Sequence, residues 1–374
     1  MLTVALRGTD RAEFVRLRAL RAAERELLRL SSLYLNRAPR LITREMLEPL
    51  QRDCHVCVEE AYCALLEATL IPEEREKEAE MRYVRRKLLP RVIRRADPAV
   101  YRRDPYYAGI CVPECRTASL HLTHATYAPY EGFAAGNLLE DEAGYAELPP
   151  IGFFEEEFSY PVLYAEGREW MAIKPSEIET MRAPLRRARG HVLMFGLGLG
   201  YFAYMAAAKP EVNRITVVER DARIRALFES ELLPQFAERK KIEIVETDAF
   251  CFAEEQGVHY GYDYAFVDLW HDVSDGLDMY LRMRRAEKHF PGTEFGYWIE
   301  DYFLSHLRGY VMDALCEAAD GGKSSSGTGG KSVTIDSMDG IRKLLSAEYL
   351  RRLSPDLYRI GDGEHAGAER ADAG

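Results

Sequence analysis

The sequence predicts an α/β protein whose central part, at 177–320, contains a mainly parallel sheet, and three observations carry this prediction. Beyond residue 177, short apolar runs alternate with helical patterns, as in right-handed βαβ units. A glycine-rich turn directly follows the first apolar run, and acidic residues end the next ones. A helical region at 1–104 and a small β-rich segment at 105–176 precede this part, and a loop, a helix and a tail at 321–374 follow it.

Three long helical patterns fill the first hundred residues. They run over 11–36, 44–70 and 73–96, and typical first residues of helices stand at their starts, namely Asp10, Thr43 and Pro72. From about residue 117 the pattern changes to short runs of β-forming residues separated by Gly and Pro, such as 119–123 and 158–164. We therefore expect a helical unit followed by a small β-rich unit.

The central part is predicted to contain five strands with helices between them. The strands are expected at 191–195, 214–219, 241–246, 262–268 and 295–299. The helices are expected near 199–208, 221–229, 249–256, 276–289 and 300–319. The glycine- and serine-rich stretch 321–330 is typical of a flexible loop, and 362–374 is typical of a disordered tail.

The composition is that of an ordinary globular protein, with 47% hydrophobic and 30% charged residues among 374. No apolar run approaches the roughly 18 residues of a membrane span, and residues 1–6 are too short for a secretory signal. Seven cysteines in a chain without such a signal favour reduced thiols over a disulfide framework. These features predict a cytoplasmic protein with no membrane partner.

Charge is unevenly distributed along the chain, whose formal net charge is −11. Residues 1–103 hold 22 Lys and Arg against 16 Asp and Glu, a net charge of +6, and the remainder carries −17. An acidic unit repels nucleic acid unless the basic N-terminal part presents it.

The turn after the first central strand has the spacing Gly-x-Gly-x-Gly, at Gly196, Gly198 and Gly200. Glycine lets a ligand approach the backbone closely and permits dihedral angles that other residues avoid. The small-residue helix that follows offers free N–H groups to an anionic carboxylate or phosphate. The pattern predicts a cofactor site where the strand turns into the helix.

Acidic residues stand at the ends of the next three strands. Glu219 ends the second strand, Asp248 follows the third and Asp268 ends the fourth. A carboxylate at the end of the second strand can accept hydrogen bonds from two ribose hydroxyls, so these positions predict an adenosyl cofactor. Two alternatives to an adenosyl cofactor of this kind are a nicotinamide cofactor and a sheet that binds no ligand. The nicotinamide fingerprint would need a glycine at position 201, where this chain has Tyr201.

On these residues the chain resembles the class I S-adenosylmethionine-dependent methyltransferases, and most of all their spermidine synthase-like branch. The resemblance covers roughly 175–290. It implies a Rossmann-like class I methyltransferase fold that binds S-adenosylmethionine. Met194 stands where most methyltransferases have an acid, and spermidine synthase-like proteins also have an apolar residue there.

The resemblance also implies roles for single residues. Glu219 would bind the ribose, with Arg220 and Asp221 beside it in the Val-Glu-Arg-Asp run. Asp248 and the backbone of Ala249 would bind the edge of the adenine. Gly196, Gly198, Gly200 and Asp268 complete the predicted cofactor-binding set.

The segment after the fourth strand is where a transferred group and its acceptor would meet. Asp268 or His271 could accept a proton there, and Trp270 could form a wall of the acceptor pocket. Alternatively, Asp268 only orients the cofactor, and His271 and Asp272 cap the helix that starts near residue 274. No Asn/Asp-Pro-Pro-Tyr motif, the pattern of enzymes that methylate adenine bases, occurs in the sequence.

Two further patterns have a functional and a structural interpretation. The pairs Cys54/Cys57 and Cys111/Cys115, the latter with His121 and His124 nearby, are spaced as zinc ligands can be. We favour no metal, because Leu50, Cys54, Cys57, Ala61 and Leu65 would share one face of a helix. The stretch 82–103 holds nine Arg and Lys and one acid, Asp97. It could dock RNA, but a solvated helix face paired with the acids at 73–78 is the commoner structure.

The sequence thus predicts an S-adenosylmethionine-dependent methyltransferase. The acceptor is not specified, and a small molecule or a protein is favoured over RNA. Aminopropyl transfer of the spermidine synthase type is the alternative activity, although that family's Tyr-His-Glu and polyamine-binding motifs have no clear counterpart before the glycine turn. An adenosyl-cofactor-binding protein without catalysis is a third alternative.

Overall fold

The structure is a computed structural model that describes residues 2–71, 73–75, 78–140, 147–256, 261–321 and 333–353. The chain forms two compact units. The larger unit comprises Ala22–His271 and Ala286–Ile299, and the smaller comprises Met1–Arg21, Asp272–Arg285 and Glu300–Gly374. The domain boundaries predicted from the sequence stay a prediction.

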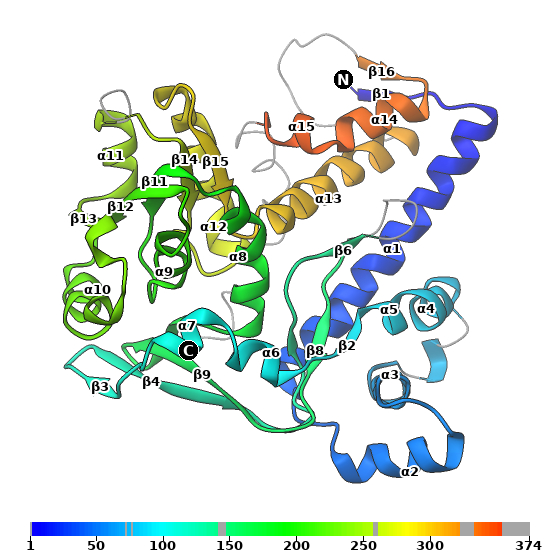
Figure 1. Cartoon of the computed structure of the whole chain (residues 1–374). Helices are drawn as coiled ribbons and strands as arrows, with labels where there is room; N and C mark the ends of the chain where they lie inside the picture. Colours follow the sequence, from blue (N-terminus) through cyan, green and yellow to red (C-terminus); the bar gives the residue numbers. More distant parts are fainter. Residues whose placement is uncertain are drawn as a thin grey trace, which may run out of the picture. The chain divides into compact units, whose positions relative to one another are not determined.

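The larger unit contains a five-stranded sheet in which every neighbouring pair is parallel (Figure 1). Its strands are β11 (Gly190–Phe195), β12 (Val212–Glu219), β13 (Ile242–Glu246), β14 (Tyr264–Val267) and β15 (Glu294–Tyr297). Their spatial order is β13-β12-β11-β14-β15, which is 3-2-1-4-5 in chain order and belongs to a Rossmann-like sheet. The predicted fold class is confirmed, and all five strands lie within three residues of the predicted bounds.

Helices connect these strands. They are α9 (Tyr201–Ala207), α10 (Ala222–Leu227), which continues into a π-turn at Phe228–Leu232, and α11 (Ala249–Gln256), while α8 (Pro175–Arg187) precedes the sheet. The chain moves outward from β11 to β13 and then back to β14, so right-handed crossovers place α11 on the opposite face from α9 and α10. The reversal lies between β11 and β14, and ligands of such sheets bind beyond the carboxyl ends at that point.

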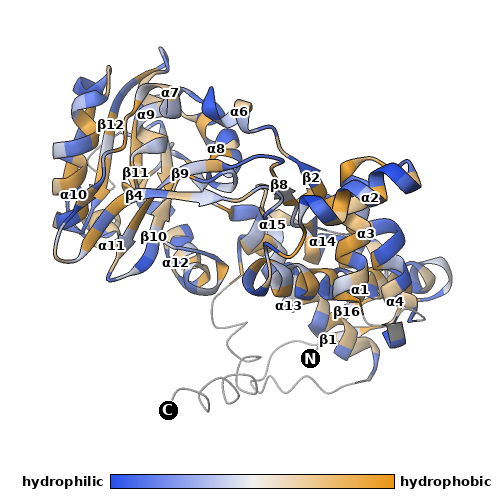
Figure 2. Cartoon of the chain, turned by 90° about the horizontal axis from the view of Figure 1, so that it is seen from below, coloured by the Kyte–Doolittle hydropathy of each residue, from blue (hydrophilic) through white to orange (hydrophobic). Residues whose placement is uncertain are grey.

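Apolar side chains explain why the central strands are buried. Val192–Phe195 of β11 and all four residues of β14 are buried, as expected for parallel strands covered on both faces. Figure 2 shows the apolar character of β11 and β12 in the ribbon colours. The rings of Phe202 and Phe266 stack at 3.9 Å between centroids, which fixes α9 against β14.

The β-rich segment forms an antiparallel sheet within the same unit. Its order is β10-β9-β4-β3, with β3 (Cys115–Arg116), β4 (Leu120–Tyr127), β9 (Phe158–Ala165) and β10 (Arg168–Ala172). The predicted strands at 119–123 and 158–164 are therefore confirmed as β4 and β9. Shorter strands form a second sheet and a hairpin: β2 (Ile93–Arg95), β5 (Phe133–Ala134) and β8 (Ile151–Phe153), then β6 (Leu139–Glu140) and β7 (Glu147–Leu148). Between β2 and β3 lie α6 (Pro98–Arg102) and α7 (Pro105–Gly109).

The second predicted helix is broken in two. The pattern at 44–70 forms α2 (Arg44–Cys54) and α3 (Val58–Leu70), and His55 between them has a left-handed backbone with φ of 54°. The predicted shared face of Leu50, Cys54, Cys57, Ala61 and Leu65 is therefore wrong, and both cysteines are exposed. Glu60 explains the restart, because its side chain accepts a hydrogen bond from the backbone N–H of Cys57.

The first predicted helix is confirmed as α1 (Gly8–Arg37), but the third, predicted over 73–96, is wrong at its end. After a 3-10 turn at Glu73–Arg75, α4 (Ala79–Tyr83) runs through a π-turn (Val84–Leu88) into α5 (Leu89–Val92). The chain then becomes extended, because Ile93–Arg95 pair with Ile151–Phe153 as strand β2. Pairing with a strand almost sixty residues away overrides the local helical pattern.

The smaller unit pairs a strand near residue 3 with one near residue 334. Strand β1 (Leu2–Val4) pairs in parallel with β16 (Val333–Ile335), and α12 (Val273–Ala286), α13 (Glu300–Ala319), α14 (Met338–Leu345) and α15 (Ala347–Leu350) complete the unit. Arg351 donates two hydrogen bonds to Glu300, which also accepts one from Tyr280. The predicted flexible loop, from residue 322, and the predicted tail lie outside the described residues. Among the described helices, none has the length and apolar character needed to cross a membrane.

Candidate functional site

The glycine turn lies at the carboxyl end of β11 and is held tightly by its neighbours. Gly196 has a φ of +95°, and a Cβ built there would lie 1.9 Å from the carbonyl oxygen of Asp268. Gly200 has a φ of +78°, and a Cβ there would lie 2.3 Å from the ring of Phe228. The protein's own packing therefore accounts for two of the three glycines, where the sequence suggested close approach of a ligand.

Gly198, the middle glycine, has different surroundings. Its φ is +56°, and nothing lies within 4 Å of the position that a Cβ would take. The turn is therefore open at this residue, which is where a ligand could contact the backbone directly.

Glu219 lies beside the turn at the end of β12. Its side chain is 9% exposed. One carboxylate oxygen accepts a hydrogen bond from the N–H of Leu197 at 3.2 Å, and the other accepts one from the N–H of Asp221 at 2.8 Å. A carboxylate has about four acceptor positions, so each oxygen can still accept a hydrogen bond from one hydroxyl. Glu219, which is predicted to bind the ribose, thus also supports the glycine turn.

Asp248 and Arg220 lie at the next strand ends. Oδ1 of Asp248 accepts hydrogen bonds from the N–H groups of Phe250 and Cys251, at 2.9 and 3.1 Å, and so caps α11. Oδ2 lies 3.9 Å from Nη1 of Arg220, whose side chain is 73% exposed. Ala249 is buried. The structure places these residues together, and their contact with adenine stays a prediction.

Asp268 belongs to a pair of half-buried carboxyl groups with Glu177 of α8. Burial and the charge of Glu219 raise the pKa of Asp268 to about 7. Burial and the charge of Asp268 raise the pKa of Glu177 to about 8, against the opposing effect of Lys174. No hydrogen bond or ion pair joins either carboxyl group to another described side chain. Near neutral pH this pair can accept or release a proton.

Glu177 was not identified as a site residue from the sequence. It stands in the first turn of α8, where acidic residues commonly occur because they interact favourably with the helix dipole. The sequence pattern therefore carried no functional signal. Helix α8 contacts α9, and only the folded chain brings Glu177 near Asp268.

Aromatic residues of the β-rich sheet lie on the Glu177 side of this carboxyl pair. Lys174 forms an ion pair with Glu169 and lies 5.9 Å from the ring centre of Tyr160. The ring of Tyr127 packs against that of Tyr160 at 4.8 Å. Burial, together with the charges of Glu169 and Glu177 among others, raises the pKa of Tyr127 well above its ordinary value. Three further aromatic residues of this region are core residues, namely Phe153, Phe154 and Phe158.

The predicted acceptor segment divides between the interior and the surface. Trp270 is 6% exposed and stacks with Tyr297 at 6.5 Å between ring centres. His271 is exposed, and its ring meets that of Trp170 edge to face at 4.4 Å. Asp272 accepts a hydrogen bond from the N–H of Ser274 at 2.7 Å, which confirms its predicted capping role. Of the two predicted bases, only Asp268 lies in the carboxyl pair.

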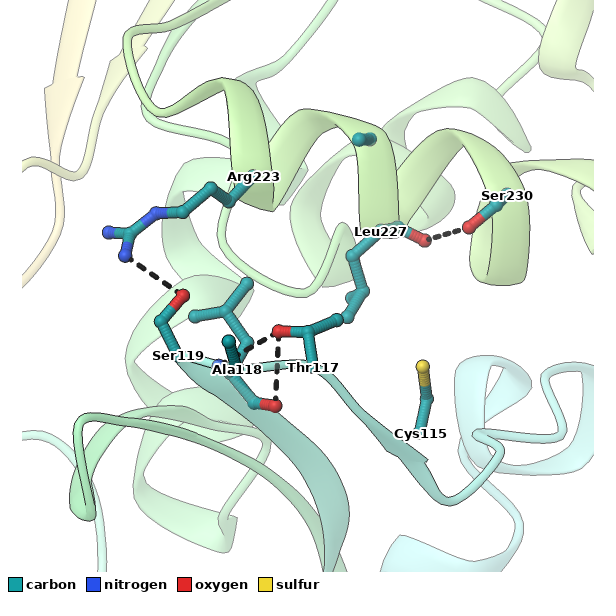
Figure 3. A pocket seen from close by; sticks show the side chains of 9 residues that line it. Cys115, Thr117, Ala118, Ser119, Arg223, Leu227 and Ser230 are labelled. Carbon is teal, nitrogen blue, oxygen red and sulfur yellow. Dashed lines mark hydrogen bonds between the residues drawn. The ribbon is translucent and has the colours of Figure 1, made fainter.

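A cavity of about 560 Å³ lies between α10 and the β3–β4 turn (Figure 3). Arg223 crosses its edge: it forms an ion pair with Asp221 at 2.7 Å and donates a hydrogen bond to Oγ of Ser119 at 3.1 Å. Because the N–H of Asp221 donates to Glu219, a continuous set of hydrogen bonds runs from Glu219 to the β-rich sheet. The remaining lining is mostly apolar: Cys115, Thr117, Ala118, Leu120, Ala226, Leu227 and Ser230.

The cysteine pairs and the basic stretch lie outside the glycine turn and the carboxyl pair. In the described part of the chain, no three His, Cys, Asp or Glu residues are grouped as a metal site would require, and all seven cysteines are free. Within 82–103, Arg85 pairs with Glu67, Arg95 with Glu155 and Arg102 with Glu156. These three acidic partners lie outside the predicted run at 73–78, part of which lies outside the described residues; within that run Arg75 pairs with Glu78.

Comparison with known proteins shows only distant likenesses. No protein-family model and no curated protein matches the chain. Among solved structures, it is similar to spermidine synthase from Thermotoga maritima, with a TM-score of 0.29 and 14% identity over 41% of this chain and 56% of that chain. It is also similar to a putative O-methyltransferase from Klebsiella pneumoniae (TM-score 0.24, 18% identity, 30% and 48% coverage). A third similar structure is Aeropyrum pernix fibrillarin in complex with S-adenosyl-L-methionine, with a TM-score of 0.22 and 20% identity over 29% of this chain and 43% of that chain.

Proposed function

We propose that the protein is a transferase that uses S-adenosylmethionine, and that it transfers the methyl group. One observation carries this proposal: an open glycine, Gly198, lies at the reversal point of a Rossmann-like sheet, with the carboxylate of Glu219 at the adjacent strand end. This is the part of the fold at which adenosyl ligands bind.

The donor groups fit such a cofactor. Glu219 is held by two backbone N–H groups in a fixed orientation and retains acceptor positions for the two ribose hydroxyls. Asp248 and Ala249 follow β13 and would bind the adenine, with Arg220 beside them. The open turn at Gly198 would admit the rest of the cofactor.

When bound, the cofactor supplies an electrophilic methyl group on a sulfonium. The protein then has to align a nucleophile and, where the acceptor carries a proton, remove it. Asp268 suits this task, because a base is most effective when its pKa lies near the working pH and burial raises the pKa of Asp268 to about 7. His271, at the surface, is the weaker candidate.

The surroundings of Asp268 favour a positively charged acceptor. The carboxyl groups of Asp268 and Glu177 interact with each other, and Glu177 also lies near Tyr127. Acidic groups and aromatic faces both attract cations. A protonated amine is a cation of this kind. The same observation keeps aminopropyl transfer as a second candidate, because that reaction also has an amine acceptor.

Calorimetric titration with S-adenosylmethionine, its decarboxylated form and NAD tests the proposal. We expect S-adenosylmethionine to bind, and Glu219→Ala to weaken it by about 30- to 1000-fold through the loss of two charge-assisted hydrogen bonds. Glu243→Ala is the matched control, because Glu243 pairs with Arg214 on the exposed part of the neighbouring strand.

Each result has a distinct meaning. Preferred binding of the decarboxylated form would favour aminopropyl transfer over methyl transfer. Binding of NAD alone would contradict the proposal. Binding of S-adenosylmethionine with no turnover on any amine, small molecule or protein tested would indicate a cofactor-binding protein without catalysis.

A further inference from the structure

A short helix from before the β-rich sheet contacts the glycine turn. Helix α7 lies next to α9 (Figure 1), and the hydroxyl of its Tyr106 donates a hydrogen bond to the carbonyl oxygen of Leu199 at 2.7 Å. Tyr106 is fully buried. The carbonyl that it binds belongs to the residue between Gly198 and Gly200, so the bond acts directly on the turn.

A second bond holds the other side of Gly200. The hydroxyl of Tyr201 donates to Oδ2 of Asp104 at 3.0 Å, and Oδ1 of Asp104 accepts the N–H of Tyr106 at 2.9 Å. Asp104 thus connects the start of α7 to the start of α9. Together the two bonds hold the residues before and after Gly200.

Close packing keeps the two helices at this distance. A Cβ at Gly109, the last residue of α7, would lie 2.3 Å from the hydroxyl of Tyr204, so a larger residue there would displace that side chain. The ring of Tyr106 also meets that of Tyr204 edge to face at 5.4 Å. These contacts leave the hydroxyl of Tyr106 little freedom to leave Leu199.

We propose that Asp104 and Tyr106 are positioning residues of the cofactor site, which hold the turn at Gly196–Gly200 in its binding conformation. The proposal rests on the proposed function, since it assigns them to the S-adenosylmethionine site. Three glycines with positive φ make a turn that is costly to order, because glycine has the most conformational freedom to lose. Side chains that order it beforehand remove part of that cost from binding.

The test compares two neighbouring tyrosines by titration of the full chain with S-adenosylmethionine. Tyr106→Phe should weaken binding by about 5- to 10-fold, the usual loss for one buried hydrogen bond. Tyr107→Phe is the matched control: its hydroxyl donates to the carbonyl of Ile173 at 2.6 Å, away from the turn, so it should bind as the wild type does. Thermal unfolding of both variants shows whether their stability losses are similar.

A second variant and a second readout separate the possible outcomes. Tyr201→Phe removes the other bond and should also weaken binding. In the protein without ligand, amide hydrogen exchange across 196–204 should speed up in both variants and not in Tyr107→Phe. Equal affinity and exchange in Tyr106→Phe and wild type would overturn this inference alone. Failure of the wild type to bind S-adenosylmethionine would instead overturn the proposed function, and the exchange result would still decide whether the tyrosines order the turn.

Discussion

Asp268 and Glu177 illustrate how single residues acquire chemistry from their surroundings. Both are acids with ordinary intrinsic behaviour, and both are placed in a half-buried site where ionisation is disfavoured. Asp268 ionises first, with a pKa of about 7, and its charge then helps to raise the pKa of Glu177 to about 8. The pair can thus exchange protons near neutral pH.

The first prediction concerns stability and pH. The folded protein keeps these two protons up to pH 7–8, whereas the unfolded chain loses them near pH 4, so the folded state binds more protons in between. The contribution of this pair to the free energy of unfolding should therefore fall as pH rises from 5 to 9. Urea unfolding of the wild type and of the Asp268→Asn, Glu177→Gln double variant should show a smaller fall in the variant. Parallel curves would contradict the raised pKa values.

The second prediction concerns the base. Asp268→Asn should lower turnover by about 10²-fold or more and leave the affinity for the cofactor within a few-fold, because a base acts on the transition state. The turnover of the wild type should rise as pH increases through about 7, and this rise should be lost in the variant. His271→Ala is the control at the surface and should retain most turnover. A larger loss in His271→Ala than in Asp268→Asn would reverse the assignment.

The third prediction separates two glycines of the same turn. Gly196→Ala should destabilise the fold severely, because its Cβ would overlap the carbonyl of Asp268. In Gly198→Ala the new Cβ meets no neighbour, so the free energy of unfolding should fall only by the ~1–2 kcal/mol of a left-handed residue. The same change should weaken binding of the cofactor. Unfolding and titration of the two variants measure this difference. Equal stabilities would show that the turn adjusts to a side chain.

At the scale of elements, the basic stretch is better described as a set of ion pairs than as one surface. It crosses α4, the π-turn, α5, β2 and α6, so its charges do not share a single helix face. Arg85, Arg95 and Arg102 each have an acidic partner in the same unit. Such pairs reduce the positive potential that a nucleic acid would meet.

The fourth prediction follows from these pairs. Changing Arg85, Arg86, Arg94 and Arg95 to Glu should leave activity nearly intact and lower stability modestly, since exposed ion pairs contribute under ~1 kcal/mol each. A gel shift with bulk cellular RNA should be absent in the wild type as well. A shift that weakens steeply with salt, and that the quadruple variant loses, would show that the stretch docks RNA.

At the scale of the whole molecule, the β-rich segment and the Rossmann-like sheet belong to one compact unit. Polar contacts join them at several places: Tyr106 to Leu199, Arg223 to Ser119, and Gln235 to both the N–H and the carbonyl of Cys111. The proposed cofactor site is therefore contacted by residues from outside the predicted cofactor domain.

The fifth prediction is that residues 177–320 do not bind S-adenosylmethionine when expressed alone. Their isolation removes Asp104, Tyr106 and Ser119, and exposes the buried face of α9. Near-ultraviolet circular dichroism and titration should show loose packing and no binding. A cooperatively folded fragment with wild-type affinity would establish the predicted boundary as a true domain boundary.

The sequence by itself determined the strands, the glycine turn and the acids at the strand ends. These features are local, because their parts are neighbours in the chain. An apolar run long enough for one buried strand is followed by glycines and then by a helical pattern. The fold class followed because right-handed crossovers leave few arrangements for such a series.

Tertiary structure decided the features that depend on distant partners. The helix predicted at 73–96 ends early because Ile93 pairs with Ile151, and Glu177 joins the candidate site because folding brings it near Asp268. Tyr106 supports the turn across 93 residues of chain. Sequence patterns report the preferences of nearby residues, whereas burial, raised pKa values and long-range hydrogen bonds arise only when the folded chain brings separate segments together.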